Sequence, residues 1–348
     1  MKNKFHITLD DIAKRLNVSK VTVSKALREH PDISFETAQK VKQVAKELGY
    51  TPNFMARNLS SKSSHTIGLV VPKIAHYFFG SVIESIYEAA LVNNYEIILT
   101  VSQENAEREE KHIRSLLSMR VDGLIISISQ QTKNYDIFNT VKNYNVPLVF
   151  MDRVVDMSEF SSITVDDRGG TFKAIEHAIK LGYRKIGHIA GYQEINIGRK
   201  RYLGFEDAMK KYDVPVNPEW VTYGGFGEED GYKAFMKLHS SGNLPEFIFA
   251  VTYPVALGIY AAAEELGLKI PDDIDIMCFG SSDINNFLTP SLSCVDQPTE
   301  ELGKQAVKLI LEIINNPTNY VPKHIEIPTG LMIRETARVL VNSKKKSG

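Results

Sequence analysis

The stretch Thr8–Leu27, TLDDIAKRLNVSKVTVSKAL, decides the fold of the first part of the chain. Thr8 and Asp11 have the spacing of a capping box, and apolar residues then recur at helical intervals over Leu9–Leu16. The segment Asn17–Ser19 interrupts this helix, and its serine is a good N-cap for a second one. Two short helices joined by a three-residue turn are typical of a helix-turn-helix.

A third helix is predicted from Ser34, with Gly49 as its stop. The inward positions are Val23, Ala26 and Leu27 of the second helix and Ala38, Val41, Val44, Ala45 and Leu48 of the third. The second helix then exposes Lys20, Val21, Ser24 and Lys25. Such amino groups and an apolar side chain suit base edges, and hydroxyls suit phosphates. We therefore expect DNA binding, with an ordinary three-helix bundle as the alternative.

Charge and composition support this division of the chain. Residues 1–62 carry 12 Lys and Arg against 6 Asp and Glu, whereas the remainder carries 29 against 36. A basic module on a mildly acidic body indicates a polyanionic partner for the front end only, although a solvated basic face is the alternative. The length of 348 residues predicts at least two domains. The two cysteines, Cys278 and Cys294, are expected to be reduced and buried.

The segment from Ile7 to Leu59 resembles, without a gap, the N-terminal signature of LacI/GalR-family transcription regulators. The resemblance implies base contacts by Lys20, Val21 and Lys25. It implies phosphate contacts by Thr8, Ser19, Thr22, Ser24, Ser34 and Asn53. Lys25 stands where arginine is most common in that family, and lysine cannot form a planar bidentate fork to guanine. The resemblance therefore does not carry over the family's base preference at that step.

After Pro52 the segment NFMARNLSS can form about two helical turns, and isolated helices shorter than ~12–15 residues are marginal in water. A plain linker is one interpretation. The resemblance implies instead a hinge helix that pairs with its dimer mate in the minor groove. Ala56 would allow close helix approach, Leu59 would be a wedge between base pairs, and Arg57 would suit the negative groove.

From Ile67 onward, short β-branched runs alternate with helical stretches. The candidate strands are residues 67–71, 96–101, 123–128 and 147–151, followed by 162–165, 185–191, 246–252 and 274–280. Apolar strands alternating with helices predict parallel sheets covered on both faces, which is a doubly wound α/β fold. Two such series suggest two lobes, and ligands of such folds bind outside the carboxyl ends of the strands.

This second part, Thr66 to Arg338, resembles the family's two-lobed effector domain of the type I periplasmic-binding-protein fold. The resemblance implies three crossings between lobes, near residues 162, 293 and 323. The expected domains are 1–51 (helix-turn-helix), 52–65 (hinge helix and linker), 66–340 (effector binding and dimerisation) and 341–348 (basic tail). Lobe 1 is expected over about 66–162 and 294–322, and lobe 2 over about 163–293 and 323–340.

The resemblance also implies a set of effector-binding residues at strand ends and at the seam between lobes. These are Phe78, Phe79, Ser102, Ser129, Asp152, Asp166, Arg199, Phe226, Thr252, Tyr253, Ser281 and Gln297. Aromatic rings can stack on a sugar or base, and Arg199 can fork onto a carboxylate, phosphate or paired hydroxyls. The alternatives are core positions for the two phenylalanines and a helix cap for Asp166.

Two departures from the sugar-responsive members concern this set. Thr252-Tyr253 stands where those members usually have Asn-Asp or Ser-Asp, and Gly280 stands where they commonly have aspartate. Without these carboxylates Arg199 is less neutralised. The sequence therefore favours a sugar derivative that is anionic or partly aromatic as the effector.

The sequence gives little support for other functional classes. It lacks the dinucleotide, P-loop, zinc-protease and hydrolase motifs, so we expect no enzyme, no cofactor and no metal. The start has no apolar signal region and no run of about 18 apolar residues occurs, which predicts a cytoplasmic protein without a membrane partner. A transport-type binding protein would need such a signal.

The chain is thus interpreted as a homodimeric repressor that reads a pseudo-palindromic double-stranded DNA operator under control of a small effector. The short ending RVLVNSKKKSG favours a dimer over a tetramer. Whether the effector releases or recruits the protein stays open, as does a phosphoprotein co-regulator.

Overall fold

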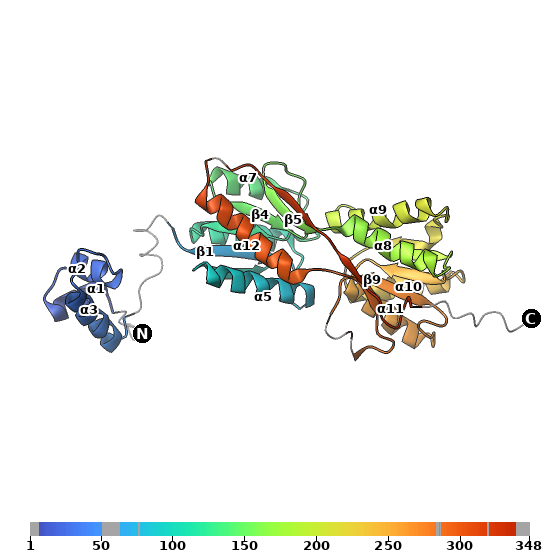
Figure 1. Cartoon of the computed structure of the whole chain (residues 1–348), viewed down its shortest axis with the longest axis horizontal. Coiled ribbons are helices and arrows are strands. Elements are labelled where there is room, and N and C mark those ends of the chain that lie inside the picture. Colours follow the sequence, from blue (N-terminus) through green and yellow to red (C-terminus); the bar gives the residue numbers. More distant parts are fainter. Residues whose placement is uncertain are drawn as a thin grey trace, which may run out of the picture. The chain divides into compact units, whose positions relative to one another are not determined.

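The computed structural model describes residues 7–50, 63–75, 77–282, 285, 287–318 and 320–338 (Figure 1). The chain divides into two compact units, Met1–Ser64 and His65–Gly348. The predicted hinge residues Ala56, Arg57 and Leu59, together with Asn53, lie outside the described residues.

The first unit contains the three predicted helices, α1 (Leu9–Leu16), α2 (Lys20–Leu27) and α3 (Phe35–Leu48). The capping box that the sequence predicts is present, since the Thr8 N–H donates to Asp11 Oδ2 at 2.8 Å. Asn17 and Gly49 end α1 and α3 with positive φ angles of 52° and 67°, a conformation that these residue types adopt most readily. A small core of buried side chains joins the helices: Ile12, Ala13, Val23, Ala26, Val41 and Ala45.

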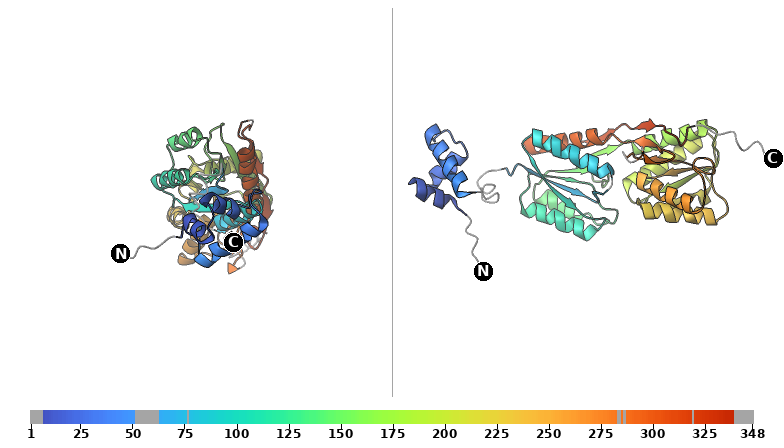
Figure 2. Two further views of the ribbon diagram at one scale, coloured as in Figure 1. Left: turned by 90° about the vertical axis from the view of Figure 1, so that its left-hand side faces the viewer. Right: turned by 90° about the horizontal axis from the view of Figure 1, so that it is seen from below.

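The second unit contains two six-stranded sheets, one in each lobe. The lobe 1 sheet has the order β11-β5-β4-β3-β1-β2, and all of its strand pairs are parallel. Its strands are β1 (Thr66–Val71), β2 (Glu96–Val101), β3 (Gly123–Ile126), β4 (Leu148–Met151), β5 (Ser161–Val165) and β11 (His324–Ile327). Its helices are α5 (Tyr77–Val92), α6 (Ala106–Ser118), α7 (Asp136–Asn143) and α12 (Thr299–Asn315). Helices α5 and α12 pack together on one face, with α6 and α7 on the other (Figure 2).

The lobe 2 sheet has the order β12-β10-β9-β8-β6-β7, in which only the β10–β12 pair is antiparallel. Its strands are β6 (Ile186–Ala190), β7 (Val221–Tyr223), β8 (Phe247–Ala250), β9 (Asp275–Phe279), β10 (Ser293–Asp296) and β12 (Gly330–Met332). Its helices are α8 (Asp167–Lys180), α9 (Asn196–Lys211), α10 (Glu228–Ser240) and α11 (Tyr253–Glu265), with the 3₁₀ turn η1 (Pro218–Trp220) before β7. Helices α8 and α9 pack together, as do α10 and α11. The doubly wound two-lobed fold is as predicted.

The crossings between lobes lie a few residues later than the sequence suggests. The chain leaves lobe 1 after Val165, returns after Asp296 and leaves again after Ile327, whereas the predicted crossings were near 162, 293 and 323. The strands remain hydrogen-bonded beyond those points, because residues 162–165 pair with 324–327 and residues 293–295 pair with 277–279. Residues 163–165 and 324–327 therefore belong to lobe 1, and residues 294–296 belong to lobe 2.

Both cysteines are free and buried, as predicted, and they are neighbours on β9 and β10. Among the described residues, no helix is both long enough and apolar enough to cross a bilayer.

Candidate functional site

The exposed face of α2 carries the residues for which base contacts are predicted. Val21 is 64% exposed, so its apolar side chain is available for contact with a partner. Lys20 forms an ion pair with Asp10 at 3.2 Å, and Lys25 forms one with Asp32 at 2.7 Å. All four charged side chains are at least one third exposed, so these pairs are weak and can exchange for phosphate or base contacts.

Three of the hydroxyl residues for which phosphate contacts are predicted, Thr8, Ser19 and Ser34, are the N-caps of α1, α2 and α3. Ser19 Oγ accepts the Thr22 N–H at 3.0 Å, and Ser34 Oγ accepts the Thr37 N–H at 3.3 Å. Ser24, farther along α2, accepts a hydrogen bond from Arg28 at 3.0 Å. Helix N-termini present N–H groups and a positive dipole end, an arrangement that favours phosphate oxygens. The DNA contacts themselves remain predictions.

A cavity of about 70 Å³ lies between the two lobes of the second unit. Its walls come from lobe 1 (Tyr77, Phe78, Phe79, Asp152 and Arg153) and from lobe 2 with its crossing segment (Ile197, Arg201, Phe226, Thr252, Tyr253, Pro254, Phe279, Gly280, Ser281 and Gln297). Eight of the twelve predicted effector residues thus line it, namely Phe78, Phe79, Asp152, Phe226, Thr252, Tyr253, Ser281 and Gln297.

The other four predicted residues lie elsewhere. Ser102 and Ser129 are buried at the ends of β2 and β3, away from the cavity wall. Asp166 caps α8, where its Oδ1 accepts the Gly169 N–H at 2.7 Å. Arg199 is exposed on α9. It does not line the cavity, because two residues along a helix correspond to about 200° of rotation, and Arg201 occupies the inward face.

Arg201 is 2% exposed and is held in the cavity wall by three groups. Its Nε donates to Asp167 Oδ1 at 2.8 Å, and its Nη1 donates to the Val251 carbonyl at 2.6 Å. Its guanidinium lies 3.7 Å from the centre of the Phe279 ring. Burial raises the pKa of the Asp167 carboxyl, and the charge of Arg201 opposes this rise. The arginine that lines the cavity therefore has a carboxylate beside it, whereas the expectation of a less neutralised arginine concerned Arg199.

Arg153 is a second buried guanidinium that the sequence reasoning missed. It is the second residue after β4 and is 4% exposed, and its Nη1 lies 2.8 and 2.9 Å from the two carboxylate oxygens of Glu104. Its guanidinium is 4.9 Å from the Phe226 ring of lobe 2. Its Nε has no hydrogen-bond partner among the described residues. The signal that could have found it is the pair Asp152-Arg153 at the carboxyl end of a buried strand.

Asp152 lies on the cavity wall, near enough to Arg153 and Arg201 for their charges to act on its carboxyl. It is 5% exposed, and its backbone has a positive φ of 62°. Burial raises the pKa of its carboxyl to about 6, against the opposing charges of Arg153 and Arg201. A non-glycine residue in the left-handed region costs conformational free energy, and such residues are frequent at functional sites.

Behind the cavity, a buried carboxyl braces the strand ends of lobe 1. Glu109 is 1% exposed and accepts hydrogen bonds from the Ser129 N–H at 2.6 Å and the Thr132 hydroxyl at 2.7 Å. Burial raises the pKa of Glu109 to about 7. Ser129 thus has a structural role in the loop after β3 and is not part of the cavity wall.

The structure gives a reason for glycine at position 280, where sugar-responsive members commonly have aspartate. Its φ is +90°, which favours glycine, and a Cβ atom there would stand 2.9 Å from Gln297 Oε1. The amide of Gln297 therefore occupies the space that a side chain at position 280 would need. An amide supplies both a donor and an acceptor, whereas a carboxylate only accepts.

A helix-turn-helix unit joined to a two-lobed α/β domain with a cavity between its lobes is the architecture of a DNA-binding regulator with a periplasmic-binding-protein-like domain. Residues 8–53 match the model of bacterial regulatory proteins of the lacI family, and residues 175–337 match that of the periplasmic binding protein-like domain.

The chain belongs to the LacI family of transcriptional regulators. It is 33% identical to the HTH-type transcriptional repressor PurR of Pectobacterium carotovorum subsp. carotovorum (strain PC1), over 89% of this chain and 91% of that protein. It is 32% identical to the NTD biosynthesis operon regulator NtdR of Bacillus subtilis (strain 168), over 94% and 99% of the two chains.

Solved structures agree with this assignment. The lac repressor dimer bound to operator and the anti-inducer ONPF is 25% identical with a TM-score of 0.83, over 95% of this chain and 99% of that one. A LacI family regulator from Enterococcus faecium with bound ribose is 26% identical with a TM-score of 0.67, over 77% and 97%. The predicted family membership is confirmed.

Proposed function

We propose that this chain is a repressor that binds a pseudo-palindromic DNA operator as a homodimer, and that a small molecule between the two lobes controls its operator affinity. The cavity between lobes carries the proposal, because it joins side chains from both lobes around buried charged groups. A ligand there contacts both lobes at once, so its binding favours one lobe arrangement over another.

The chemistry of the cavity supports a sugar or sugar derivative. Arg153 and Arg201 supply donors, and each has a buried carboxylate partner, Glu104 and Asp167. Asp152 adds an acceptor beside them. Sugar hydroxyls both donate and accept, so they match adjacent donors and acceptors better than a ligand with a single strong charge does. The proposal therefore includes neutral sugars as well as the anionic or partly aromatic derivatives that the sequence favours.

Aromatic side chains support the same ligand class. Phe78, Phe79, Phe226 and Tyr253 lie on the cavity wall, and their rings can cover the apolar faces of a sugar ring. The ribose complex of the Enterococcus faecium relative is consistent with a carbohydrate in this fold. We therefore propose a carbohydrate or a related metabolite as the effector and no catalytic activity.

An exposed apolar surface on lobe 1 supports the homodimer. Tyr87 is 51% exposed, Leu91 55% and Val92 82% along α5, and Leu99 is 38% exposed on the neighbouring strand β2. Large exposed apolar surfaces on a folded domain often mark protein interfaces. We propose a second copy of this chain as the occupant, as in the lac repressor dimer.

The test combines a ligand screen with DNA binding. Sugars, sugar acids and sugar phosphates are screened by thermal shift, and fluorescence anisotropy then measures binding to DNA from the protein's own promoter region with and without each hit. We expect specific binding that survives excess nonspecific DNA and changes with the hit. If no promoter DNA competes better than random DNA, or if no hit alters the affinity, the proposal is wrong.

A further inference from the structure

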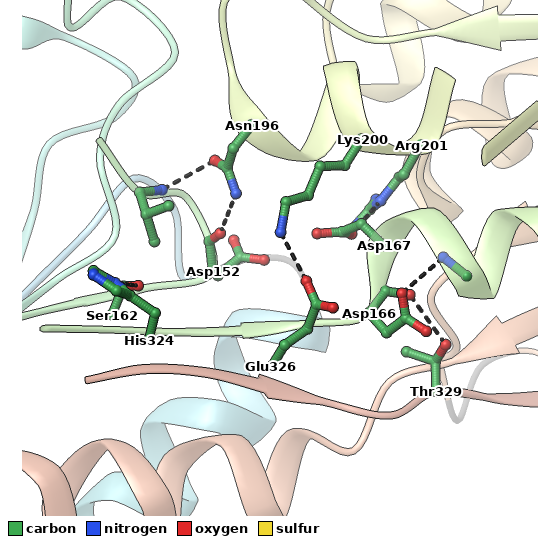
Figure 3. A network of polar contacts seen from close by, with 12 residues as sticks. Asp152, Ser162, Asp166, Asp167, Asn196, Lys200, Arg201, His324, Glu326 and Thr329 are labelled. Carbon is green, nitrogen blue, oxygen red and sulfur yellow. Dashed lines mark hydrogen bonds and ion pairs between the residues drawn. The ribbon is translucent and has the colours of Figure 1, made fainter. Parts of the chain in front are cut away.

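Helix α9 contacts both lobes through two neighbouring faces (Figure 3). Ile197 and Arg201, four residues apart, line the cavity. Asn196 and Lys200, also four residues apart, bind groups of lobe 1. Residues four apart lie above one another on a helix, so each pair forms one stripe. The cavity stripe and the lobe 1 stripe are therefore adjacent on one rigid element.

Asn196 provides the more buried contact. Its Nδ2 donates to the Asp152 carbonyl at 2.9 Å, and its Oδ1 accepts the Val154 N–H at 3.0 Å. The side chain is 5% exposed, and both partners belong to the backbone just after β4 of lobe 1. One amide thus satisfies two backbone groups of the segment that carries the cavity residues Asp152 and Arg153.

Lys200 provides the second contact, one helical turn farther along. Its Nζ lies 2.8 Å from Glu326 Oε2, and Glu326 belongs to β11 of the lobe 1 sheet. The two side chains are 35% and 48% exposed. Water and salt screen such a pair, so it is weaker than the Asn196 contact and more sensitive to ionic strength.

We propose that Asn196 and Lys200 form a latch that holds lobe 1 against α9 and so couples the cavity to the relative position of the lobes. The latch contacts lobe 1 directly from the helix that carries Arg201. A ligand that contacts both Asp152 and Arg201 then favours the same lobe arrangement as the latch, and their effects on its population multiply. This coupling does not depend on which effector the cavity takes.

The test measures the distance between lobes in the full-length protein without ligand. Spin labels are attached at Lys111→Cys on α6 and Lys237→Cys on α10, both exposed positions, and double electron–electron resonance gives the distance distribution. The native cysteines are fully buried, which disfavours their labelling. Circular dichroism checks that each variant is folded.

We expect Asn196→Ala to lower the ratio of latched to unlatched protein about tenfold, because it removes two hydrogen bonds. Lys200→Glu should lower the ratio about two- to fivefold, because the exposed pair is weak. The exchange Lys200→Glu with Glu326→Lys should restore the original distribution. The matched control is Lys233→Glu, which reverses an exposed pair with Glu229 inside α10 and should leave the distribution unchanged.

Two results would overturn the latch. One is an unchanged distribution in both Asn196→Ala and Lys200→Glu. The other is a Lys200→Glu effect that the charge exchange does not reverse, since the ion pair would then not be its cause. Neither result bears on whether a sugar binds in the cavity, so failure of the latch and failure of the proposed effector site remain distinguishable.

Discussion

His188 gives the second unit a pH dependence that can be isolated experimentally. The residue lies on β6, is completely buried, and its Nδ1 lies 2.8 Å from the Phe249 carbonyl oxygen. The centre of its ring lies 6.3 Å from that of the Tyr202 ring, which is nearly parallel to it, and 5.3 Å from that of the Phe205 ring. Burial lowers the pKa of His188 to about 4, with the nearby charge of Arg201 acting in the same direction. The folded protein therefore holds the imidazole neutral.

The sign of the effect follows from the two protonation states. Below its ordinary pKa of about 6.5 the unfolded chain takes up a proton at His188, whereas the folded chain does so only near pH 4. Stability is therefore lost as the pH falls from about 6.5 towards 4. At pH 5 the expected loss from this residue is about 2 kcal/mol, and the full shift corresponds to about 3 kcal/mol.

The measurement compares the pH dependence of unfolding in the wild type with that in a His188 variant. This comparison is needed because the raised pKa values of Asp152 and Glu109 lower stability as the pH rises, opposite to the effect of His188. Urea unfolding of the wild type and of His188→Phe is followed at pH 7.5 and pH 5.0. The variant keeps an aromatic ring but cannot be protonated. The wild type should lose about 2 kcal/mol more than the variant between the two pH values. Equal losses in the two proteins would refute the assignment of a neutral buried imidazole.

Three further predictions concern the cavity, its support and the hinge. The stability of Glu109→Gln relative to the wild type should be greater at pH 8 than at pH 5, by about 3 kcal/mol at most. Burial disfavours the charged Glu109 carboxylate and raises its pKa to about 7, so the wild type loses stability as the pH rises through that value. Urea unfolding at both pH values tests this, and the same difference in unfolding free energy at pH 5 and pH 8 would contradict it. Arg201→Lys should weaken the binding of a screening hit about tenfold or more in calorimetry, because lysine cannot reproduce the guanidinium fork, and Arg199→Ala should leave it unchanged. If Arg199→Ala weakened binding and Arg201→Lys did not, Arg199 would be the ligand-binding arginine, as the sequence suggested. Leu59→Ala should weaken operator binding and bending in gel-shift assays and leave the hit's affinity for the free protein unchanged; retained bending would exclude the wedge.

Local signals explain why the first unit could be predicted closely. The caps at Thr8, Ser19 and Ser34 and the stop at Gly49 lie within a few residues of the helices that they delimit, and the structure has each of them. The strands β7, β10, β11 and β12 were not predicted. They have three or four residues each, and their sequences (VTY, SCVD, HIEI and GLM) lack the continuous apolar runs of the strands that were predicted. Such short strands depend on pairing more than on local propensity.

The residues of the cavity show a second limit of prediction from the sequence. Within the helix α9, only packing against the sheet decides whether Arg199 or Arg201 faces inward. The charge partners Glu104 and Asp167 could not be assigned for the same reason, since the Arg153–Glu104 contact spans 49 residues. Of the polar residues predicted at strand ends of lobe 1, Asp152 lines the cavity, whereas Ser102 and Ser129 are buried outside its lining.

The arrangement of residues on α9 allows the contact with lobe 1 and the contact with a ligand to be altered separately. Because Lys200 and Arg201 are consecutive, they point about 100° apart, one towards Glu326 and the other into the cavity. A substitution at Lys200 should therefore change the distribution of lobe positions without removing a ligand contact. A substitution at Arg201 should remove a ligand contact while the Lys200 pair persists. If effector binding and lobe position are linked, the Lys200 variants must also shift effector affinity, by no more than the factor by which they shift the lobe equilibrium.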